Sequence, residues 1–330
     1  MRYSKTFCCI CSLSATLLFA CTSNGGSIAS NDTPKNEPES KIVNMLKTSQ
    51  DIKTVQKWDE MQLSDGITYV KAQVVKASER PASINIVVAE AGAGVLKTGC
   101  AEPTDIEPFP MKKPGEIAEM FDNGDEQVMV VQGGDFFRWN PSEEGVWAKD
   151  FGCRGPVHHR GKVLQDHFVS NANMPHQALS FLAVDKDGKV SIADASEYDN
   201  MKSTLLECTG GGYRPLRNGK ICKGFDIYIN GSWCELEDKY PFSCIGYRED
   251  GSIVMIIVDG RTEISMGLTY AEAGSIMKAL GCTDAITLDG GGSAQMVIRN
   301  PKTGSFTLQN RPTDGGERNM RTYWMITVTK

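Results

Sequence analysis

Short apolar segments separated by turn-forming residues run through most of the chain, and they constrain its fold more than any other feature. GITYVKAQVV (66–75) and ASINIVVAEA (82–91) are rich in the β-branched and aromatic residues typical of strands, with the turn-forming SERPAS between them. Further strands are predicted in EQVMVVQG, ALSFLAV, GFDIYI and SIVMIIVDG. TYAEAGSIMKALG has a clear helical pattern, with Thr269 as N-cap and Gly281 after its last turn. These segments predict an α+β fold with a mixed, mostly antiparallel sheet, or several such sheets, and a few packed helices.

The N-terminal residues predict export. MRYSK supplies two positive charges, and CCICSLSATLLFA is an apolar run that is too short for a comfortable membrane span. The run ends in LLFAC, which resembles the lipobox of bacterial lipoproteins. On that resemblance residues 1–20 are a signal peptide and Cys21 is the lipidated first residue of the mature chain, anchored in the bacterial cell envelope (periplasm or outer membrane). Alternatively, a plain secretory signal is cleaved nearby, and the chain is still exported.

Residues 21–57 connect this segment to the rest of the chain. TSNGGSIASNDTPKNEPES is polar and cannot bury apolar area, so a flexible tether is expected after Cys21. Residues 41–58 could form one helix, because their apolar residues are loosely periodic. No second linker and no internal repeat follow, which predicts a single domain over residues 58–330.

Charge and composition limit the partners. The formal net charge is −6, and no block of Lys or Arg runs along the chain, which argues against broad nucleic-acid binding but leaves room for a local basic site. The expected partners are a small-molecule or glycan substrate and the membrane, through the lipid at Cys21. Outside the signal peptide the chain has neither a CxxC pair nor an HExxH motif, so no cofactor is predicted as required and a divalent cation has no support from the sequence.

Cysteines outside the signal peptide and Cys21 are odd in number, which leaves at least one free thiol in an exported protein. Cys208, Cys222, Cys234 and Cys244 lie near one another in the sequence and could form one or two disulfides. Equally, they could be small buried hydrophobic side chains.

The stretch AITLDGGGSAQM places bare backbone beside a carboxylate. A short strand delivers Asp289 to its end. Gly290, Gly291 and Gly292 can adopt positive φ and bring their N–H groups close to a ligand. Ser293 adds a hydroxyl, and the combination suits an anionic or hydroxyl-rich ligand. The pattern is neither a P-loop nor G-x-G-x-x-G. Alternatively, the glycines form a tight turn or bulge that binds nothing.

Three further stretches contain candidate site residues. IIVDGR places Asp259 and Arg261 after an apolar strand, and the planar fork of arginine fits phosphate or carboxylate. VVQGGDFFRWN places Asp135 between glycines and aromatic residues that could wall a sugar site. GGERNMR contains Glu317 and Arg318. The structural alternatives are a surface β-turn, core packing and a solvated charged turn, respectively.

The order of these motifs resembles the phosphodiester glycosidase family. IGYREDGSIVMIIVDGR, SMGLTYAEAGSIMKALGCTDAITLDGGGSAQM and GGERNMRTYWMI are similar to its strand, DGR, helix with Glu, LDGGGS and final ER segments. QGGDFF and CTGGGYRPLRNGK extend the resemblance, more weakly, toward residue 60. Two positions depart from the family pattern. Phe242 stands where family members commonly have Arg, and Gly133 stands where Asn is expected.

The resemblance implies hydrolysis of a sugar-1-phosphodiester of the GlcNAc-1-phosphodiester type, with residues 58–330 as the catalytic domain. A phosphodiester leaves more readily than an alkoxide, so the site must stabilise an oxocarbenium-like state, activate a water or nucleophile, and hold the phosphate. Asp289 and Glu272 are the candidates for nucleophile or general base. Asp135 is a third carboxyl group, for catalysis or for sugar hydroxyls.

The expected phosphate cradle consists of Arg261 and Arg318 with the glycine N–H groups and Ser293. Asp259 either contributes to substrate binding or holds the DGR turn. A second function fits the same residues: a catalytically weak or inactive glycan-binding lipoprotein of the cell envelope, which Phe242 and Gly133 favour.

Overall fold

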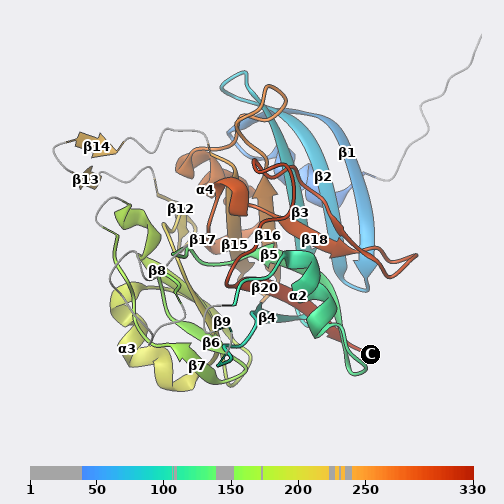
Figure 1. Ribbon diagram of the computed structural model, residues 1–330. Helices are drawn as coiled ribbons and strands as arrows, with labels where there is room; N and C mark the ends of the chain where they lie inside the picture. The colour runs from blue at the N-terminus through green and yellow to red at the C-terminus, as the bar shows by residue number, and fades with distance from the viewer. Residues whose placement is uncertain are drawn as a thin grey trace, which may run out of the picture. The chain divides into compact units, whose positions relative to one another are not determined.

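The computed structural model describes residues 39–105, 107, 110–138, 152–171, 174–222, 227–229, 232–234 and 240–330, with the backbone alone at 227–229 and 232–234. Glu39–Lys330 belong to one structural unit (Figure 1). The predicted signal peptide, Cys21 and the tether up to residue 38 lie outside the described residues. None of the described helices combines the length and the apolar character that a membrane crossing requires.

Three sheets contain most of the strands, and every strand pair in the described part of the chain is antiparallel. The eight-stranded large sheet has the order β1 (Ile52–Ser64), β2 (Ile67–Lys76), β3 (Pro81–Ala89), β16 (Ile253–Val258), β15 (Phe242–Arg248), β17 (Cys282–Thr287), β11 (Leu216–Arg217), β12 (Lys220–Ile221). The five-stranded β5 sheet has the order β19 (Phe306–Leu308), β18 (Met296–Arg299), β5 (Glu126–Gly133), β20 (Tyr323–Thr329), β4 (Val95–Gly99). The five-stranded β10 sheet has the order β7 (Lys162–Gln165), β6 (Val157–His159), β10 (Leu205–Gly211), β8 (Ser180–Asp185), β9 (Val190–Asp194). A separate hairpin pairs β13 (Ile227–Ile229) with β14 (Ser232–Cys234).

Helices are short in the described part of the chain. They are α1 (Lys41–Lys47), α2 (Pro114–Phe121), α3 (Tyr198–Met201) and α4 (Tyr270–Ala279), with 3-10 turns η1 (Pro175–Gln177), η2 (Ala195–Glu197), η3 (Lys202–Thr204) and η4 (Gly291–Ser293). α4 begins as predicted, because the amide of Glu272 donates to the Thr269 hydroxyl at 3.2 Å and the Glu272 carboxylate accepts from the Thr269 amide at 2.9 Å. The α+β fold of mostly antiparallel sheets is confirmed, and the six predicted strands correspond to β2, β3, β5, β8, β13 and β16.

The N-terminal helix is shorter than residues 41–58. α1 ends at Lys47, and β1 begins at Ile52 and pairs with β2 along almost its entire length. β-branched residues such as Thr54 and Val55 favour a strand, and the partner strand follows directly in the sequence. The hairpin therefore replaces the second half of the predicted helix.

The large sheet is covered on both faces. In β3, Ile86 and Val88 belong to the core that α1 and α4 share with this sheet, whereas Val87 and Ala89 belong to the core between the large sheet and the two five-stranded sheets. Figure 1 shows α4 against the large sheet and α2 beside the β5 sheet. Because both faces are buried at β3 and β16, these two strands are buried along almost their entire length, whereas β2 alternates and β1 is mostly exposed.

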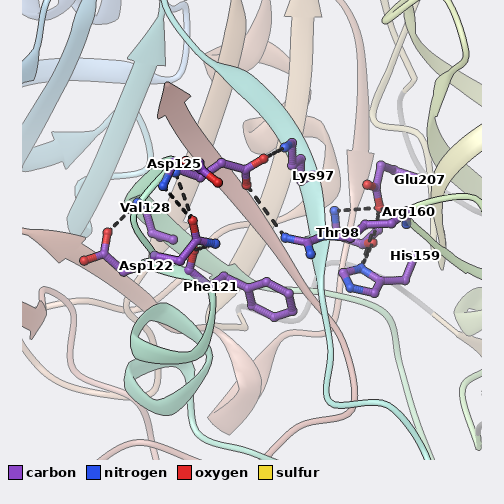
Figure 2. A network of polar contacts seen from close by, with 11 residues as sticks. Lys97, Thr98, Phe121, Asp122, Asp125, Val128, His159, Arg160 and Glu207 are labelled. Atoms are coloured by element: carbon purple, nitrogen blue, oxygen red, sulfur yellow. Dashed lines mark hydrogen bonds and ion pairs between the residues drawn. The ribbon is translucent and has the colours of Figure 1, made fainter. Parts of the chain in front are cut away.

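A buried polar network joins the two five-stranded sheets (Figure 2). Glu207 of β10 accepts from the Thr98 hydroxyl, from the Thr98 amide at 3.3 Å and from the Arg160 amide at 3.2 Å. His159 Nδ1 lies 3.0 Å from the same hydroxyl, and burial lowers the pKa of His159 to about 4, so the ring is neutral at pH 7. The Arg160 guanidinium lies 5.1 Å from the ring centroid of Phe121 in α2. Since the buried carboxylate has several donors, the network fixes the sheets together without leaving it unpaired.

The described cysteine side chains are free thiols. Cys208 and Cys244 are buried, Cys222 is partly exposed, and none of the three forms a disulfide. The side chain of Cys234 lies outside the described residues. Cys208 and Cys244 are therefore small buried hydrophobic side chains, the second of the two predicted roles.

Candidate active site

The ends of three strands, one from each sheet, meet at one place. Asp289 follows β17 of the large sheet, and Asp135 follows β5. The Asp289 amide donates to the carbonyl of Gly134 at 3.0 Å, and the amide of Gly212, just after β10, donates to the carbonyl of Thr287 at 2.8 Å. The junction brings together the LDGGGS, GGDFF and CTGGG stretches, which are distant in the sequence.

Glycine is required at the end of β5. A Cβ on Gly133 would collide with the carbonyl oxygen of Ser293 and lie 3.2 Å from Sδ of Met320. The Gly133 amide donates to the carbonyl of Gln295 at 3.1 Å. The asparagine expected at this position has no room, because the two backbones touch directly.

Asp289 is partly exposed, and the loop that follows holds its carboxylate. The Ser293 side chain and the backbone of Gly290 both favour its ionised form and lower its pKa. The Ser293 hydroxyl in turn accepts from Nη1 of Arg318 at 3.1 Å. Burial raises the pKa of Asp289 to about 6, although the Ser293 hydrogen bond and the charge of Arg318 lower it. Asp289 is therefore mostly ionised at pH 7 and takes up a proton in mild acid.

Asp135 is fully buried. Its Oδ2 accepts from the Gly155 amide at 2.7 Å, and its own amide donates to the Thr322 hydroxyl at 3.0 Å. Its Oδ1 has no hydrogen-bond partner among the described residues. Burial raises the pKa of Asp135 well above the ordinary value, and the charge of Asp289 raises it further. Asp289 is therefore mostly ionised at pH 7, whereas burial favours the neutral form of Asp135, and two carboxyl groups with such different surroundings suit acid–base chemistry.

The three loop glycines have different roles. Gly291 adopts a left-handed φ of 58°, whereas Gly290 has a φ of −97°. The Gly291 amide donates to the carbonyl of Pro241 at 3.2 Å, and the backbone of Gly290 lowers the pKa of Asp289. The loop amides are thus at least partly used within the protein, and Gly292 itself is buried against the side chains of Arg318 and Asp314.

Arg318 and Glu317 of the final ER segment act on different elements. Nε of Arg318 donates to Oδ2 of Asp314 at 2.6 Å, while its Nη1 reaches Ser293. The Glu317 carboxylate lies beside Gly115 in the first turn of α2, with Oε1 3.1 Å from the place a Cβ on Gly115 would take. Arg318 therefore supports the glycine loop, and the negative charge of Glu317 lies at the start of a helix, where it is favourable.

The guanidinium of Arg261 lies beside the glycine loop. It sits 5.4 Å from the ring centroid of Tyr240, and its Nη1 is 3.6 Å from the place a Cβ on Gly291 would take. Arg261 is exposed and has a left-handed φ of 60°. Among the described residues its guanidinium has no hydrogen-bond or ion-pair partner, so its donors are available to an anion.

Asp259 holds the DGR turn. Its Oδ1 accepts from the Arg311 amide at 2.8 Å and from Nδ2 of Asn310 at 3.2 Å. Its carbonyl accepts from the Ser265 hydroxyl at 2.6 Å. These buried contacts match the structural role that was one of the two predicted for Asp259, and they leave Arg261 as the exposed side chain of the motif.

The contacts of Glu272 are structural. Besides capping α4 through Thr269, its Oε2 lies 2.8 Å from Nζ of Lys76, a side chain with no exposed surface. Lys76 also donates to the carbonyl of Gly267 at 2.9 Å. Among the described residues no contact joins this carboxylate to the glycine loop, so the catalytic role predicted for Glu272 stays without support from its contacts.

Phe242 and two residues that the sequence analysis did not single out complete the surroundings. Phe242 is buried and packs its ring 5.2 Å from that of Tyr270, in the core under α4. Tyr240 lies under Arg261, and His176 packs its ring edge-on against Phe136 at 5.9 Å. Nothing in YPFSCIG or NMPHQ marks either residue, because the contacts come from segments distant in the sequence. Trp139, in the predicted aromatic wall, lies outside the described residues.

In the described part of the chain, no three His, Cys, Asp or Glu side chains gather closely enough to hold a metal ion. His158 Nε2 lies 2.6 Å from the Tyr198 hydroxyl, and His167 Nδ1 lies 3.1 Å from Asp166. These histidines have packing and surface roles.

Comparisons with known proteins agree with these motifs. The sequence model of the phosphodiester glycosidase family matches residues 125–327. The chain is 40% identical over 87 residues to the SPbeta prophage-derived uncharacterized protein YomE of Bacillus subtilis, covering 26% of this chain and 13% of that protein. It is 28% identical over 207 residues to human N-acetylglucosamine-1-phosphodiester alpha-N-acetylglucosaminidase and 26% identical to the mouse protein. These matches cover 58% of this chain, which spans 35% and 34% of those two proteins.

Solved structures share the fold. The zebrafish N-acetylglucosamine-1-phosphodiester alpha-N-acetylglucosaminidase catalytic domain, auto-inhibited by its pro-peptide, matches with a TM-score of 0.55 and 18% identity, over 84% of this chain and 86% of that one. A hypothetical protein from Synechocystis matches with a TM-score of 0.53 and 12% identity, over 82% of this chain and 64% of that one.

The Lys76–Glu272 pair yields a prediction about stability. Replacing Glu272 by Gln removes the charge that faces the buried Lys76 ammonium but keeps a hydrogen-bond acceptor. We expect the free energy of unfolding in urea to fall by about 1–3 kcal/mol. Glu263→Gln, at an exposed position of the neighbouring loop, is the matched control and should change it by less than about 0.5 kcal/mol. Equal unfolding curves for the two variants would contradict the structural role.

Proposed function

Because the chain belongs to the phosphodiester glycosidase family, we propose that it hydrolyses a sugar-1-phosphodiester to the free sugar and a phosphomonoester. The observation that carries the proposal is the partly exposed Asp289 carboxylate, with its pKa near 6, followed by a glycine loop that has the guanidinium of Arg261 beside Gly291. The human and mouse relatives are named for N-acetylglucosamine-1-phosphodiester. We therefore propose N-acetylglucosamine-1-phosphodiesters as the substrate class of this protein.

Arg261 and the glycine loop are the proposed phosphate site. The guanidinium offers a planar fork of donors that matches the oxygens of a phosphate. Arg318 is engaged with Asp314 and Ser293, so its proposed role is to hold the loop and the Ser293 hydroxyl in place. The positive charges would stabilise the negative charge that develops on the departing phosphate.

Asp289 is the proposed nucleophile or general base. In the reaction the bond from the anomeric carbon to the phosphate oxygen breaks, and the phosphate keeps the electron pair. Water supplies the new sugar hydroxyl, either directly, with its proton passing to Asp289, or after a covalent sugar–Asp289 intermediate. Burial raises the pKa of Asp135 and so favours its neutral form, and its Oδ1, which has no partner among the described residues, suits a hydrogen bond to a sugar hydroxyl.

Phe242 favours a second candidate function, glycan binding with weak or no turnover. Its apolar ring is buried under α4 at a position where the resemblance predicts a guanidinium. A site with fewer positive charges would stabilise the departing phosphate less. Turnover of a phosphodiester separates the two functions.

Residues 1–21 support a proposal about location: export and lipid anchoring at Cys21 in the bacterial cell envelope. Replacing Cys21 by Ser removes the thiol that would carry lipid. We expect the variant to lose its membrane association, measured as the share of the protein that sediments with membranes. Cys222→Ser, at a partly exposed position of the folded unit, is the control. Equal sedimentation of the wild type and Cys21→Ser would contradict the anchor.

The central experiment incubates the protein with UDP-GlcNAc, in which C1 of GlcNAc is esterified to the diphosphate of UDP, and measures free GlcNAc. We expect release by the wild type and a loss of about 10²–10⁴-fold in Asp289→Asn, which removes the ionisable group. Asp250→Asn is the control, because Asp250 is exposed in the turn at the opposite end of β15 and β16. Tight binding of the intact ligand without any release would favour the glycan-binding function.

The pKa of Asp289 predicts a pH dependence. An ionised Asp289 is required, so kcat/KM should fall tenfold per pH unit below about 6 and level off above it. Arg318→Met should move this midpoint upward, because the charge of Arg318 lowers the pKa of Asp289. A profile that stays flat between about pH 4.5 and 8 would rule out this role for Asp289.

A further inference from the structure

The surroundings of Asp289 differ in chemistry on two sides. At Gly291 the loop meets the guanidinium of Arg261 and the carbonyl of Pro241. At Thr287, two residues before Asp289, the strand meets the CTGGG segment instead. The first side is cationic and suits phosphate, which leaves the second side for the sugar ring.

On the side of the CTGGG segment, Gly212 lies where three segments of the chain meet. A Cβ on Gly212 would lie 2.8 Å from the carbonyl oxygen of His176, 2.9 Å from the Thr287 hydroxyl and 3.0 Å from the ring of Phe136. Phe136 directly follows Asp135 in the sequence. The η1 turn that carries His176 is therefore adjacent to the strand ends that carry both carboxyl groups of the site.

The His176 ring has the properties of a side chain that binds a sugar. It is partly buried, with its edge-to-face contact to Phe136 at an interplanar angle of 82°. Among the described residues neither ring nitrogen has a hydrogen-bond partner, whereas His158 and His159 are engaged with Tyr198 and Thr98. Burial lowers the pKa of His176, so the ring is neutral at pH 7 and offers one donor and one acceptor.

We propose that His176 binds the sugar of the substrate, hydrogen-bonding a ring hydroxyl or the acetamido group on the Gly212 side of Asp289, with Phe136 as an apolar wall. The inference rests on the proposed function, which assigns the phosphate to Arg261. A neutral imidazole beside an aromatic ring is a typical means of orienting a polar, uncharged ligand. His176 thus determines which sugar is accepted and leaves the phosphate contacts unchanged.

The test separates the two halves of the ligand. The full chain, with its histidines labelled with ¹⁵N, is titrated with N-acetylglucosamine and separately with inorganic phosphate. The sugar should shift the His176 ring signals, and His176→Ala should weaken sugar binding about tenfold with phosphate binding unchanged. Arg261→Met should show the reverse. His176→Asn, which keeps a neutral donor and acceptor, should restore part of the affinity, and His167→Ala, at an exposed histidine, should bind both ligands normally.

Each outcome decides the inference. The inference is overturned if the wild type does not bind the sugar, if His176→Ala binds it normally, or if that variant loses both ligands equally. Matching unfolding curves for His176→Ala and the wild type exclude a folding defect. If the sugar binds through His176 but UDP-GlcNAc is not cleaved, the proposed hydrolysis fails and the sugar site stands. If cleavage occurs and its KM is unchanged in His176→Ala, the sugar site alone fails.

Discussion

The direct backbone contact between the end of β5 and the glycine loop is the constraint on which the site depends. Gly133 lies against Ser293 and bonds Gln295, and Gly134 accepts from Asp289. A side chain at Gly133 would separate these segments, and Asp289 would then lose its place beside Asp135. The packing of the large sheet against the β5 sheet therefore sets the distance between the two carboxyl groups, because each group follows a strand of a different sheet.

Arg261 and Arg318 are both cations near the glycine loop, but their different surroundings give them different roles. Arg318 donates hydrogen bonds to Asp314 and to the Ser293 hydroxyl, and its charge lowers the pKa of Asp289. Arg261 lies over Tyr240 in a strained backbone conformation, with its donors unused by the described residues. A free guanidinium held by stacking and by a rigid turn is already organised for an anion, so little side-chain freedom is lost on binding.

Motif chemistry predicted much of this arrangement, and contacts between distant segments account for the rest. The sequence analysis selected Asp289, Asp135 and Arg261 because each follows an apolar strand next to glycine, and the fold brings these strand ends together. It overestimated the loop amides, because the amide of Gly291 donates to the carbonyl of Pro241, which directly precedes β15 and is distant in the sequence. The helix predicted over 41–58 failed for a similar reason, because pairing with β2 outweighs local periodicity.

The junction of three sheets has a consequence for how the protein acquires its function. Gly133 and Gln295 are far apart in the chain, and so are Asp135 and its partner Thr322. Closing such long loops is entropically unfavourable until the sheets dock, so contacts of this kind form late in folding. No partly folded segment can contain the paired carboxyl groups and their supporting loop. Competence at this site is therefore acquired in one step, with the completed fold, and would be lost in the same step on unfolding.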